Sequence, residues 1–141
     1  MKSKKILVVD DELHITKILS FKLVKAGLSV MTASDGEEAL RLACENKPDV
    51  ILTDFHMPVL NGYRLAVRLR NEPRTSEIPL IMLTGRGHKL SPADLAKTNI
   101  TALIPKPFSA REVLAKVQAL VELIDDGTEI DNGCGPGSAV A

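Results

Sequence analysis

Two short apolar segments that each end in aspartate are the feature that most limits how this chain can fold. Residues 6–9 (Ile-Leu-Val-Val) lead into Asp10 and Asp11. Residues 50–53 (Val-Ile-Leu-Thr) lead into Asp54. Short runs of this kind are typical of strands buried on both faces of a parallel sheet. Side chains just beyond such strands lie at the edge of the sheet where α/β folds bind ligands. The pattern therefore predicts a cluster of carboxylates at one edge of a buried sheet.

Apolar and amphipathic segments alternate five times along the 141 residues. The predicted strands cover residues 6–9, 28–32, 49–53, 80–83 and 100–104. The predicted helices cover residues 11–26, 35–45, 63–71, 92–97 and 110–124. Because short loops connect these segments, we expect an α/β domain with a parallel sheet covered by helices on both faces.

Local signals place the ends of several helices. Ser34, Ser91 and Ser109 each precede a predicted helix, where a serine side chain can accept a hydrogen bond from the first turn. Pro92 suits the first position of a helix, and Gly27 suits the end of the first helix. The apolar residues of that first helix are predicted to share one face, and they are Ile15, Ile18, Leu19, Leu23 and Ala26.

The composition argues against several classes of protein. With 18 basic and 18 acidic residues, no strongly basic surface is expected for direct binding of nucleic acid. The first apolar run is too short for a signal peptide, and no stretch approaches the roughly 20 apolar residues of a membrane span. Cys44 and Cys134 are far apart and are expected to be free thiols. A cytoplasmic location without membrane contact is therefore expected.

The last part of the chain differs in composition from the rest. After Ile124 the sequence is rich in acidic residues and glycine and has few large apolar residues. A segment of this composition buries too little apolar surface to offset the entropy of ordering it. We therefore expect one domain in residues 1–124, followed in residues 125–141 by a flexible tail or the start of a linker.

The spacing of Asp11 and Asp54 predicts that their strands are neighbours. The two residues are 43 positions apart, which accommodates two strand–helix units and leaves the second strand on the outside. The crevice between the first and third strands is then a ligand site of the kind found where the strand order reverses. Carboxylates gathered there repel one another unless a cation lies among them, and oxygen ligands favour a hard ion such as Mg²⁺. The alternative is that Asp10 or Asp11 only caps the following helix.

Two further polar residues follow predicted strands. Thr84 closes the fourth strand and can donate a hydrogen bond to an anionic group near Asp54, although it can equally just end the strand. Lys106 lies between Pro105 and Pro107 after the fifth strand. An ammonium pinned beside carboxylates suits contact with phosphate, but a surface lysine in a tight turn has the same pattern. The Lys106–Pro107 peptide bond is a candidate for the cis form.

Together these residues can carry out one reaction. A carboxylate can act as a nucleophile toward a phosphoryl group and become an aspartyl phosphate. Asp54 is the best candidate for the nucleophile because it stands alone at the end of its strand, whereas Asp10 and Asp11 suit metal binding. Lys106 and Thr84 would hold the phosphoryl oxygens.

Four short motifs occur in a fixed order along the chain. They are Ile6-Leu7-Val8-Val9-Asp10-Asp11-Glu12, Asp54-Phe55-His56-Met57-Pro58 with Asn61-Gly62, Leu83-Thr84-Gly85, and Lys106-Pro107-Phe108. Over residues 4–124, this set resembles the receiver domain of two-component response regulators. The resemblance implies a doubly wound, flavodoxin-like fold, with a five-stranded parallel sheet in the order 2-1-3-4-5 and five flanking helices.

The resemblance also implies roles for the acidic residues. Asp54 resembles the phosphoacceptor, which is charged from a phosphohistidine on a sensor histidine kinase or a phosphotransfer protein. Asp11, Asp54 and the backbone carbonyl of His56 resemble the ligands of Mg²⁺, with Asp10 assisting through water.

The same resemblance implies how such a domain signals. Thr84 resembles the switch hydroxyl that moves toward the phosphoryl group, and Lys106 resembles the lysine that contacts it. The domain would catalyse only its own phosphorylation and slow autodephosphorylation. It would act as a monomer or weak homodimer through a downstream protein or a fused output domain. Leu103 departs from the family pattern, which usually has an aromatic residue three positions before the lysine.

Two other functions fit part of the pattern. The aliphatic Leu103 is compatible with a degenerate receiver that serves only as a docking scaffold. A Mg²⁺-dependent phosphatase or phosphotransferase could use Asp54 as its nucleophile on small molecules, with His56 as the local acid–base candidate. The intact acids, Thr84 and Lys106 favour a signalling receiver.

Overall fold

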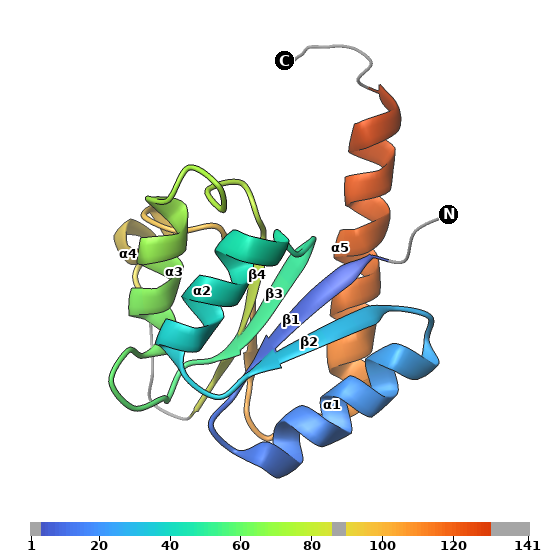
Figure 1. The fold of residues 1–141 in the computed structure, drawn as a ribbon, viewed down its shortest axis with the longest axis horizontal. Coiled ribbons are helices and arrows are strands. Elements are labelled where there is room, and N and C mark those ends of the chain that lie inside the picture. The colour runs from blue at the N-terminus through green and yellow to red at the C-terminus, as the bar shows by residue number, and fades with distance from the viewer. Residues whose placement is uncertain (1–3, 86–89, 131–141) are drawn as a thin grey trace.

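The structure of the protein, a computed structural model, describes residues 4–85 and 90–130, with side chains described as far as residue 124. The strands are β1 (Lys5–Val9), β2 (Ser29–Ala33), β3 (Val50–Asp54), β4 (Leu80–Thr84) and β5 (Ile100–Pro105). The helices are α1 (Leu13–Lys25), α2 (Gly36–Asn46), α3 (Gly62–Arg70), α4 (Pro92–Ala96) and α5 (Ala110–Ile130). The predicted alternation of strand and helix is confirmed (Figure 1).

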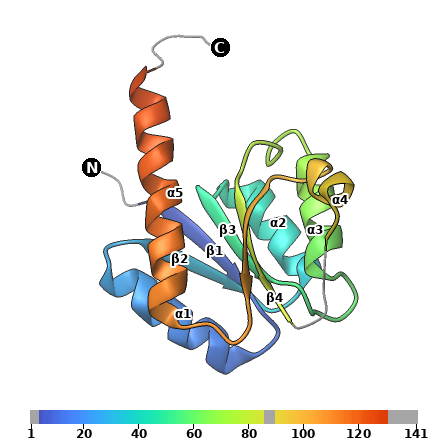
Figure 2. The ribbon, with the colours of Figure 1, turned by 180° about the vertical axis from the view of Figure 1, so that it is seen from behind.

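The five strands form one sheet in the order β2-β1-β3-β4-β5, and every neighbouring pair is parallel. Helices α1 and α5 cover one face of the sheet, and α2 and α3 cover the other (Figures 1 and 2). The predicted doubly wound α/β fold is confirmed. The carboxyl ends of β1, β3 and β4 therefore meet at one edge of the sheet, which we call the carboxyl edge.

Alternation along the strands divides the apolar interior into two cores. On β3, Leu52 belongs to the core under α1 and α5, where it joins Leu19 and Val113. Its neighbour Ile51 belongs to the core under α2 and α3, where it joins Leu65. Successive side chains of a strand point to opposite faces, so a strand with helices on both sides is apolar at every position. This explains the continuous apolar runs in the sequence.

Most helix ends agree with the predictions, and one capping residue is wrong. Ser91 and Ser109 each accept a hydrogen bond from the first turn of α4 and α5, as expected. Helix α2 is capped by Asp35 and not by Ser34: the Asp35 carboxylate accepts from the Glu38 N–H at 2.8 Å. Ser34 instead donates its N–H and hydroxyl to the Glu38 carboxylate.

One other helix end agrees with its prediction, whereas one helix face and one further helix end differ. Gly27 has a φ of 95° directly after α1, which confirms it as the end of that helix. Ile18, expected on the buried face of α1, is 54% exposed. Helix α5 continues past residue 124 to Ile130, and in Figure 1 its last turns extend beyond the sheet. The rest of the predicted tail, residues 131–141, lies outside the described residues.

No helix within residues 4–85 and 90–130 is long and apolar enough to span a membrane.

Candidate functional site

Three aspartates from two neighbouring strands meet at the carboxyl edge. Asp10 and Asp11 directly follow β1, and Asp54 is the last residue of β3. Strands β1 and β3 are paired so that Val9 lies opposite Thr53, which places the residues after them at the same height. One carboxylate oxygen from each aspartate lies within 4.8 Å of the other two. We call this cluster of Asp10, Asp11 and Asp54 the acidic site.

Two members of the acidic site are buried. Asp10 is 1% exposed and Asp54 is 2% exposed, whereas Asp11 is exposed. Asp10 Oδ1 accepts a hydrogen bond from the Glu12 N–H at 2.9 Å. Asp10 Oδ2 is buried and has no hydrogen-bond partner among the described residues. Burial of a carboxylate oxygen without a partner is costly, so the site is electrostatically incomplete.

Burial raises the pKa of Asp10 to about 6. The main cause is the loss of water around the carboxylate, because a poorly solvated group resists ionisation. The hydrogen bond from the Glu12 N–H works in the opposite direction, and the nearby charge of Asp54 adds to the rise. A carboxylate perturbed in this way at the rim of an α/β sheet is a candidate for a functional role.

Lys106 brings a positive charge to the acidic site. Its Nζ lies 2.7 Å from Asp54 Oδ1, and its backbone N–H donates to the Thr84 carbonyl at 2.7 Å. Burial alone would lower the pKa of Lys106, but the hydrogen bond and the charge of Asp54 outweigh it, so the pKa is raised. The Lys106–Pro107 peptide bond is cis, as predicted.

Thr84 lies at the same edge, one strand further along. It ends β4 and is 7% exposed, and Leu83 just before it is paired with Asp54. The structure therefore places Thr84 beside the phosphoacceptor candidate and joins its carbonyl to Lys106. That its hydroxyl acts as a switch stays a prediction.

The loop that follows Asp54 is held close to the sheet. The Gly62 N–H donates to the Phe55 carbonyl at 2.9 Å, and a Cβ on Gly62 would lie 2.4 Å from the Asp54 carbonyl oxygen. Glycine is therefore required where α3 meets the end of β3. The His56 side chain is exposed, and its ring lies edge-on to the Phe55 ring.

The alternative that Asp10 or Asp11 caps the first helix is wrong. The N-cap residue of α1 is Glu12, and its side chain makes no capping hydrogen bond. The carboxylate of Asp10 accepts from the N–H of Glu12, before the helix begins. Neither aspartate is therefore the N-cap residue of α1.

The residues of the acidic site fit a hard divalent cation. Three carboxylates lie within 4.8 Å of one another, and among the described residues the ammonium paired with them is that of Lys106. The buried oxygen of Asp10 that lacks a hydrogen-bond partner is a ready ligand atom. All candidate donors are oxygens, as Mg²⁺ prefers, and no soft sulfur ligand is included.

An apolar groove beside Lys106 was not predicted from the sequence. It has a volume of about 540 Å³ and lies between α1 and the connection from β5 to α5. Its wall on α1 includes Ile15 and the half-exposed Ile18, and its other wall includes Phe108. The sequence could have indicated this groove, because the apolar residues of α1 extend around more of the helix than one buried face requires.

The doubly wound sheet, with a cluster of acids at its carboxyl edge, is that of an α/β domain of flavodoxin-like topology. The family model for the response regulator receiver domain matches residues 6–118. The chain therefore belongs to the response regulator receiver domain family.

Individual relatives agree with this family. The chain is 38% identical to the alkaline phosphatase synthesis transcriptional regulatory protein PhoP of Bacillus subtilis over 133 residues, which is 92% of this chain and 55% of PhoP. It is 35% identical to the phosphate regulon transcriptional regulatory protein PhoB of Pseudomonas aeruginosa over 127 residues, or 90% of this chain and 56% of PhoB. The chain spans about half the length of the curated relatives that it matches.

Solved structures show the same fold. The chemotaxis protein CheY4 of Vibrio cholerae aligns with a TM-score of 0.75 at 32% identity and covers 84% of this chain and 99% of its own. The receiver domain of the sensor histidine kinase PA1611 from Pseudomonas aeruginosa aligns with a TM-score of 0.75 at 26% identity, covering 86% and 99%. That receiver was solved with a magnesium ion coordinated in its active site cleft.

Proposed function

We propose that this chain accepts a phosphoryl group on Asp54 from a phosphohistidine and then changes the surface that it offers to a downstream partner. The observation that supports this most directly is the buried Asp54 carboxylate, which lies among two other carboxylates and 2.7 Å from the Lys106 ammonium. A nucleophile, its cation and a metal-binding cluster thus meet at one point.

The proposed cofactor is Mg²⁺. Asp11, Asp54 and the backbone carbonyl of His56 would hold it, with Asp10 assisting through water. When bound, the ion would neutralise the negative charge that otherwise keeps a phosphoryl group away from these acids. The raised pKa of Asp10 supports this assignment, because a carboxylate that burial has deprived of water gains from a neighbouring cation.

Asp54, Lys106 and Thr84 each have a separate role in the proposed reaction. An oxygen of Asp54 attacks the phosphorus, the bond between phosphorus and the donor imidazole nitrogen breaks, and the imidazole leaves with the bonding electrons and takes up a proton. Lys106 then transfers its contact from the Asp54 carboxylate to a phosphoryl oxygen. Thr84 donates its hydroxyl to another phosphoryl oxygen, which favours one conformation of the β4 end.

The proposed partners follow from this chemistry. The donor would be a sensor histidine kinase or a phosphotransfer protein, and the groove between α1 and Phe108 lies beside Lys106, where apolar side chains of a docked donor would fit. The balanced net charge gives no reason to propose direct binding of nucleic acid by this part of the protein. The proposed output acts through a downstream protein or a fused domain. We also propose a cytoplasmic location and a monomer or weak homodimer.

The proposed limits of the domain follow the packing. Ile124, the last residue of α5 whose side chain the structure describes, packs against the core formed with α1. We propose residues 1–124 as the receiver, and residues 125–141 as a tail or the start of a linker whose first part continues α5 as far as Ile130. The proposed receiver catalyses its own phosphorylation and slow dephosphorylation and no other reaction.

Incubation with acetyl phosphate and Mg²⁺, followed by intact mass measurement, tests the proposed function. The expected result is a single phosphoryl adduct on the wild-type chain that is lost in Asp54→Asn. Asp49→Asn, at the opposite edge of the sheet, is the matched control and should keep the adduct. Steady hydrolysis of acetyl phosphate without an adduct would instead indicate a phosphatase, and the lack of any reaction would indicate a docking scaffold.

A further inference from the structure

A buried hydroxyl beneath the acidic site has no part in the proposed chemistry. Thr53 precedes Asp54 on β3 and has no exposed surface (0%). Its partners across the sheet, Val9 on β1 and Met82 on β4, both belong to the core under α2 and α3. A threonine in such surroundings is expected to use its hydroxyl, because burying an unpaired one is costly.

The Thr53 hydroxyl contacts the loop after Asp54 at two points. Thr53 Oγ1 donates to the Asp54 carbonyl oxygen at 3.0 Å and lies 3.9 Å from Met57 Sδ. A hydroxyl has one proton, and a carbonyl oxygen is a better acceptor than a thioether, so the hydrogen bond belongs to the carbonyl. Met57 is 8% exposed and packs in the same core. The two contacts lie on either side of His56 in the sequence.

The Asp54 carbonyl is also confined from another direction. Gly62, at the start of α3, approaches so closely that an added Cβ would lie 2.4 Å from this oxygen. The Gly62 N–H donates to the next carbonyl, that of Phe55, at 2.9 Å. The peptide that leads out of Asp54 is therefore held between a side-chain hydroxyl and the backbone of α3. Removing the hydroxyl would remove one of these two restraints on the carbonyl.

We propose that Thr53 is a positioning residue of the metal site, whose hydroxyl fixes the peptide after Asp54 and thereby the His56 carbonyl that binds Mg²⁺. This inference rests on the proposed function, because it takes Asp11, Asp54 and the His56 carbonyl as the metal ligands. Thr53 itself touches neither metal nor phosphoryl group. Partners that orient metal ligands typically change metal affinity by about 10- to 100-fold when they are removed.

Thr53→Val tests this inference because it keeps the shape of the side chain and removes the hydroxyl. We expect Mg²⁺ affinity of the full chain, measured by titration of backbone amide chemical shifts, to fall about tenfold. Thr53→Ser keeps the hydroxyl and should restore most of that affinity. If Thr53→Val does not fold, Thr53→Ala removes the same hydroxyl without adding bulk and carries the same expectation.

Thr75→Val is the matched control. Thr75 is also buried, at 1% exposure, and its Oγ1 donates to the Leu69 carbonyl at 2.7 Å, but it lies in the connection from α3 to β4 at the other edge of the sheet. Urea unfolding should show that Thr75→Val loses stability while its Mg²⁺ affinity stays that of the wild type. Loss of stability alone would then not explain a weaker Mg²⁺ site in the Thr53 variants.

The outcomes separate this inference from the proposed function. A folded Thr53→Val or Thr53→Ala variant with wild-type Mg²⁺ affinity would overturn the positioning role. Thr53→Ser as weak as Thr53→Val, or an equal loss of affinity in Thr75→Val, would overturn the assignment to the hydroxyl. A wild-type chain that binds no Mg²⁺ would overturn the proposed metal site itself, before any variant is compared.

Discussion

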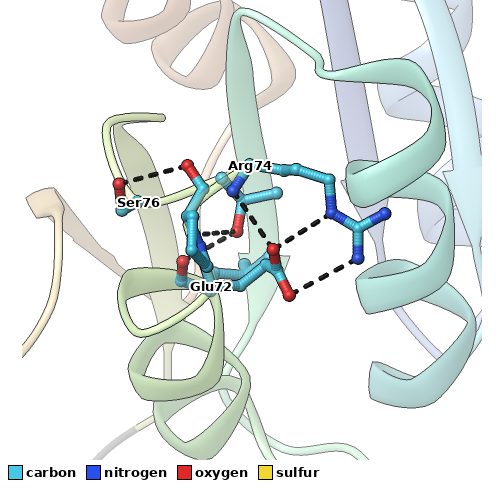
Figure 3. Close-up of polar contacts among 6 residues, drawn as sticks. Glu72, Arg74 and Ser76 are labelled. Carbon is cyan, nitrogen blue, oxygen red and sulfur yellow. Dashed lines mark hydrogen bonds and ion pairs between the residues drawn. The ribbon is translucent and has the colours of Figure 1, made fainter.

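Two groups of charged residues at opposite edges of the sheet show how differently charge can be used in one small domain. At the carboxyl edge, the carboxylates of Asp10 and Asp54 are almost fully buried and a buried oxygen of Asp10 has no hydrogen-bond partner among the described residues. At the other edge, in the connection from α3 to β4, Glu72 and Arg74 form an ion pair on the surface (Figure 3). Within the described part of the chain, the first group leaves a buried carboxylate oxygen without a hydrogen-bond partner, whereas the charges of the second group pair with each other.

The geometry of the Glu72–Arg74 pair accounts for the difference. Arg74 Nε lies 3.0 Å and Nη2 lies 3.4 Å from the two carboxylate oxygens of Glu72, and the Arg74 backbone N–H also donates to that carboxylate. The hydrogen bonds from Arg74 lower the pKa of Glu72, whereas burial raises that of Asp10. Surface charges that are paired with each other need no further partner. Buried carboxylates without such a partner favour the binding of a cation.

The largest effect is expected when the cation of the carboxyl edge is removed. Lys106→Met takes away the ammonium that lies 2.7 Å from Asp54 Oδ1 and would contact the phosphoryl group. We expect phosphorylation by acetyl phosphate to slow about 100-fold, as for the loss of one donor to a developing negative charge. Lys116→Met, on the exposed face of α5, is the matched control. Equal rates in both variants would show that Lys106 plays no part in the reaction.

The two groups should respond to acid in opposite directions. The pKa of Asp10 is about 6, above the usual 3.8, so the folded state disfavours its ionised form. Without metal, Asp10 therefore adds stability below its unfolded pKa, and this contribution is lost as the pH rises through 6, with a limit of about 3 kcal/mol. Asp10→Asn should remove this dependence, as measured by urea unfolding in EDTA across that pH range. Glu72, whose pKa is lowered, adds stability at higher pH and loses it on acidification.

If Asp10→Asn keeps the full pH dependence of the wild type, the burial of Asp10 is not what makes the carboxyl edge sensitive to acid. Glu72→Gln is the comparison variant, because it should remove a dependence of the opposite sign.

A smaller effect is expected when a methyl group is added at Gly62, where the backbone of α3 lies against the end of β3. Gly62→Ala adds a Cβ 2.4 Å from the Asp54 carbonyl oxygen, so the start of α3 and the end of β3 must move apart. Overpacking of this kind costs about 2 kcal/mol of unfolding free energy. Gly27→Ala meets no atom within 4 Å but has a φ of 95°, so its cost would come from strain alone. Only Gly62→Ala should also weaken Mg²⁺ binding; if both glycine variants bind Mg²⁺ equally well, the contact with Asp54 does not shape the site.

The smallest effect is expected for the Glu72–Arg74 pair, at the edge opposite the carboxyl edge. Arg74→Met removes a surface ion pair, so urea unfolding should change only slightly and Mg²⁺ affinity should not change. A loss of Mg²⁺ affinity in this variant would mean that the two edges are coupled, and the contrast between them would not hold.

The sequence was sufficient to predict the features that depend on long apolar runs. Strands buried on both faces leave little choice of register, so the convergence of Asp11 and Asp54 followed from the spacing of two such runs. Lys106 was predicted at the same edge because two prolines held it just after the fifth strand, and the structure places its Nζ beside Asp54. The roles of these residues in phosphorylation stay predictions.

Other features depend on contacts that the sequence does not reveal. Thr53 lies in an apolar strand, where a threonine is common for its shape, so its hydroxyl bond to Asp54 gave no signal. Ser34 and Asp35 are adjacent residues that both suit a helix cap, and only the path of the chain decides between them. Ile18 was wrongly placed inside because α1 has apolar residues on its outer face as well.

The most direct test of the contrast between the two edges is the free energy of unfolding in urea with and without Mg²⁺. If the acidic site is completed by this ion, Mg²⁺ at about 100 times its dissociation constant should stabilise the wild-type chain by about 2.7 kcal/mol. Glu72→Gln should show the same gain, and Asp11→Asn should show little of it. A wild-type chain whose stability is the same with and without Mg²⁺ would contradict the assignment of the carboxyl edge as a metal site.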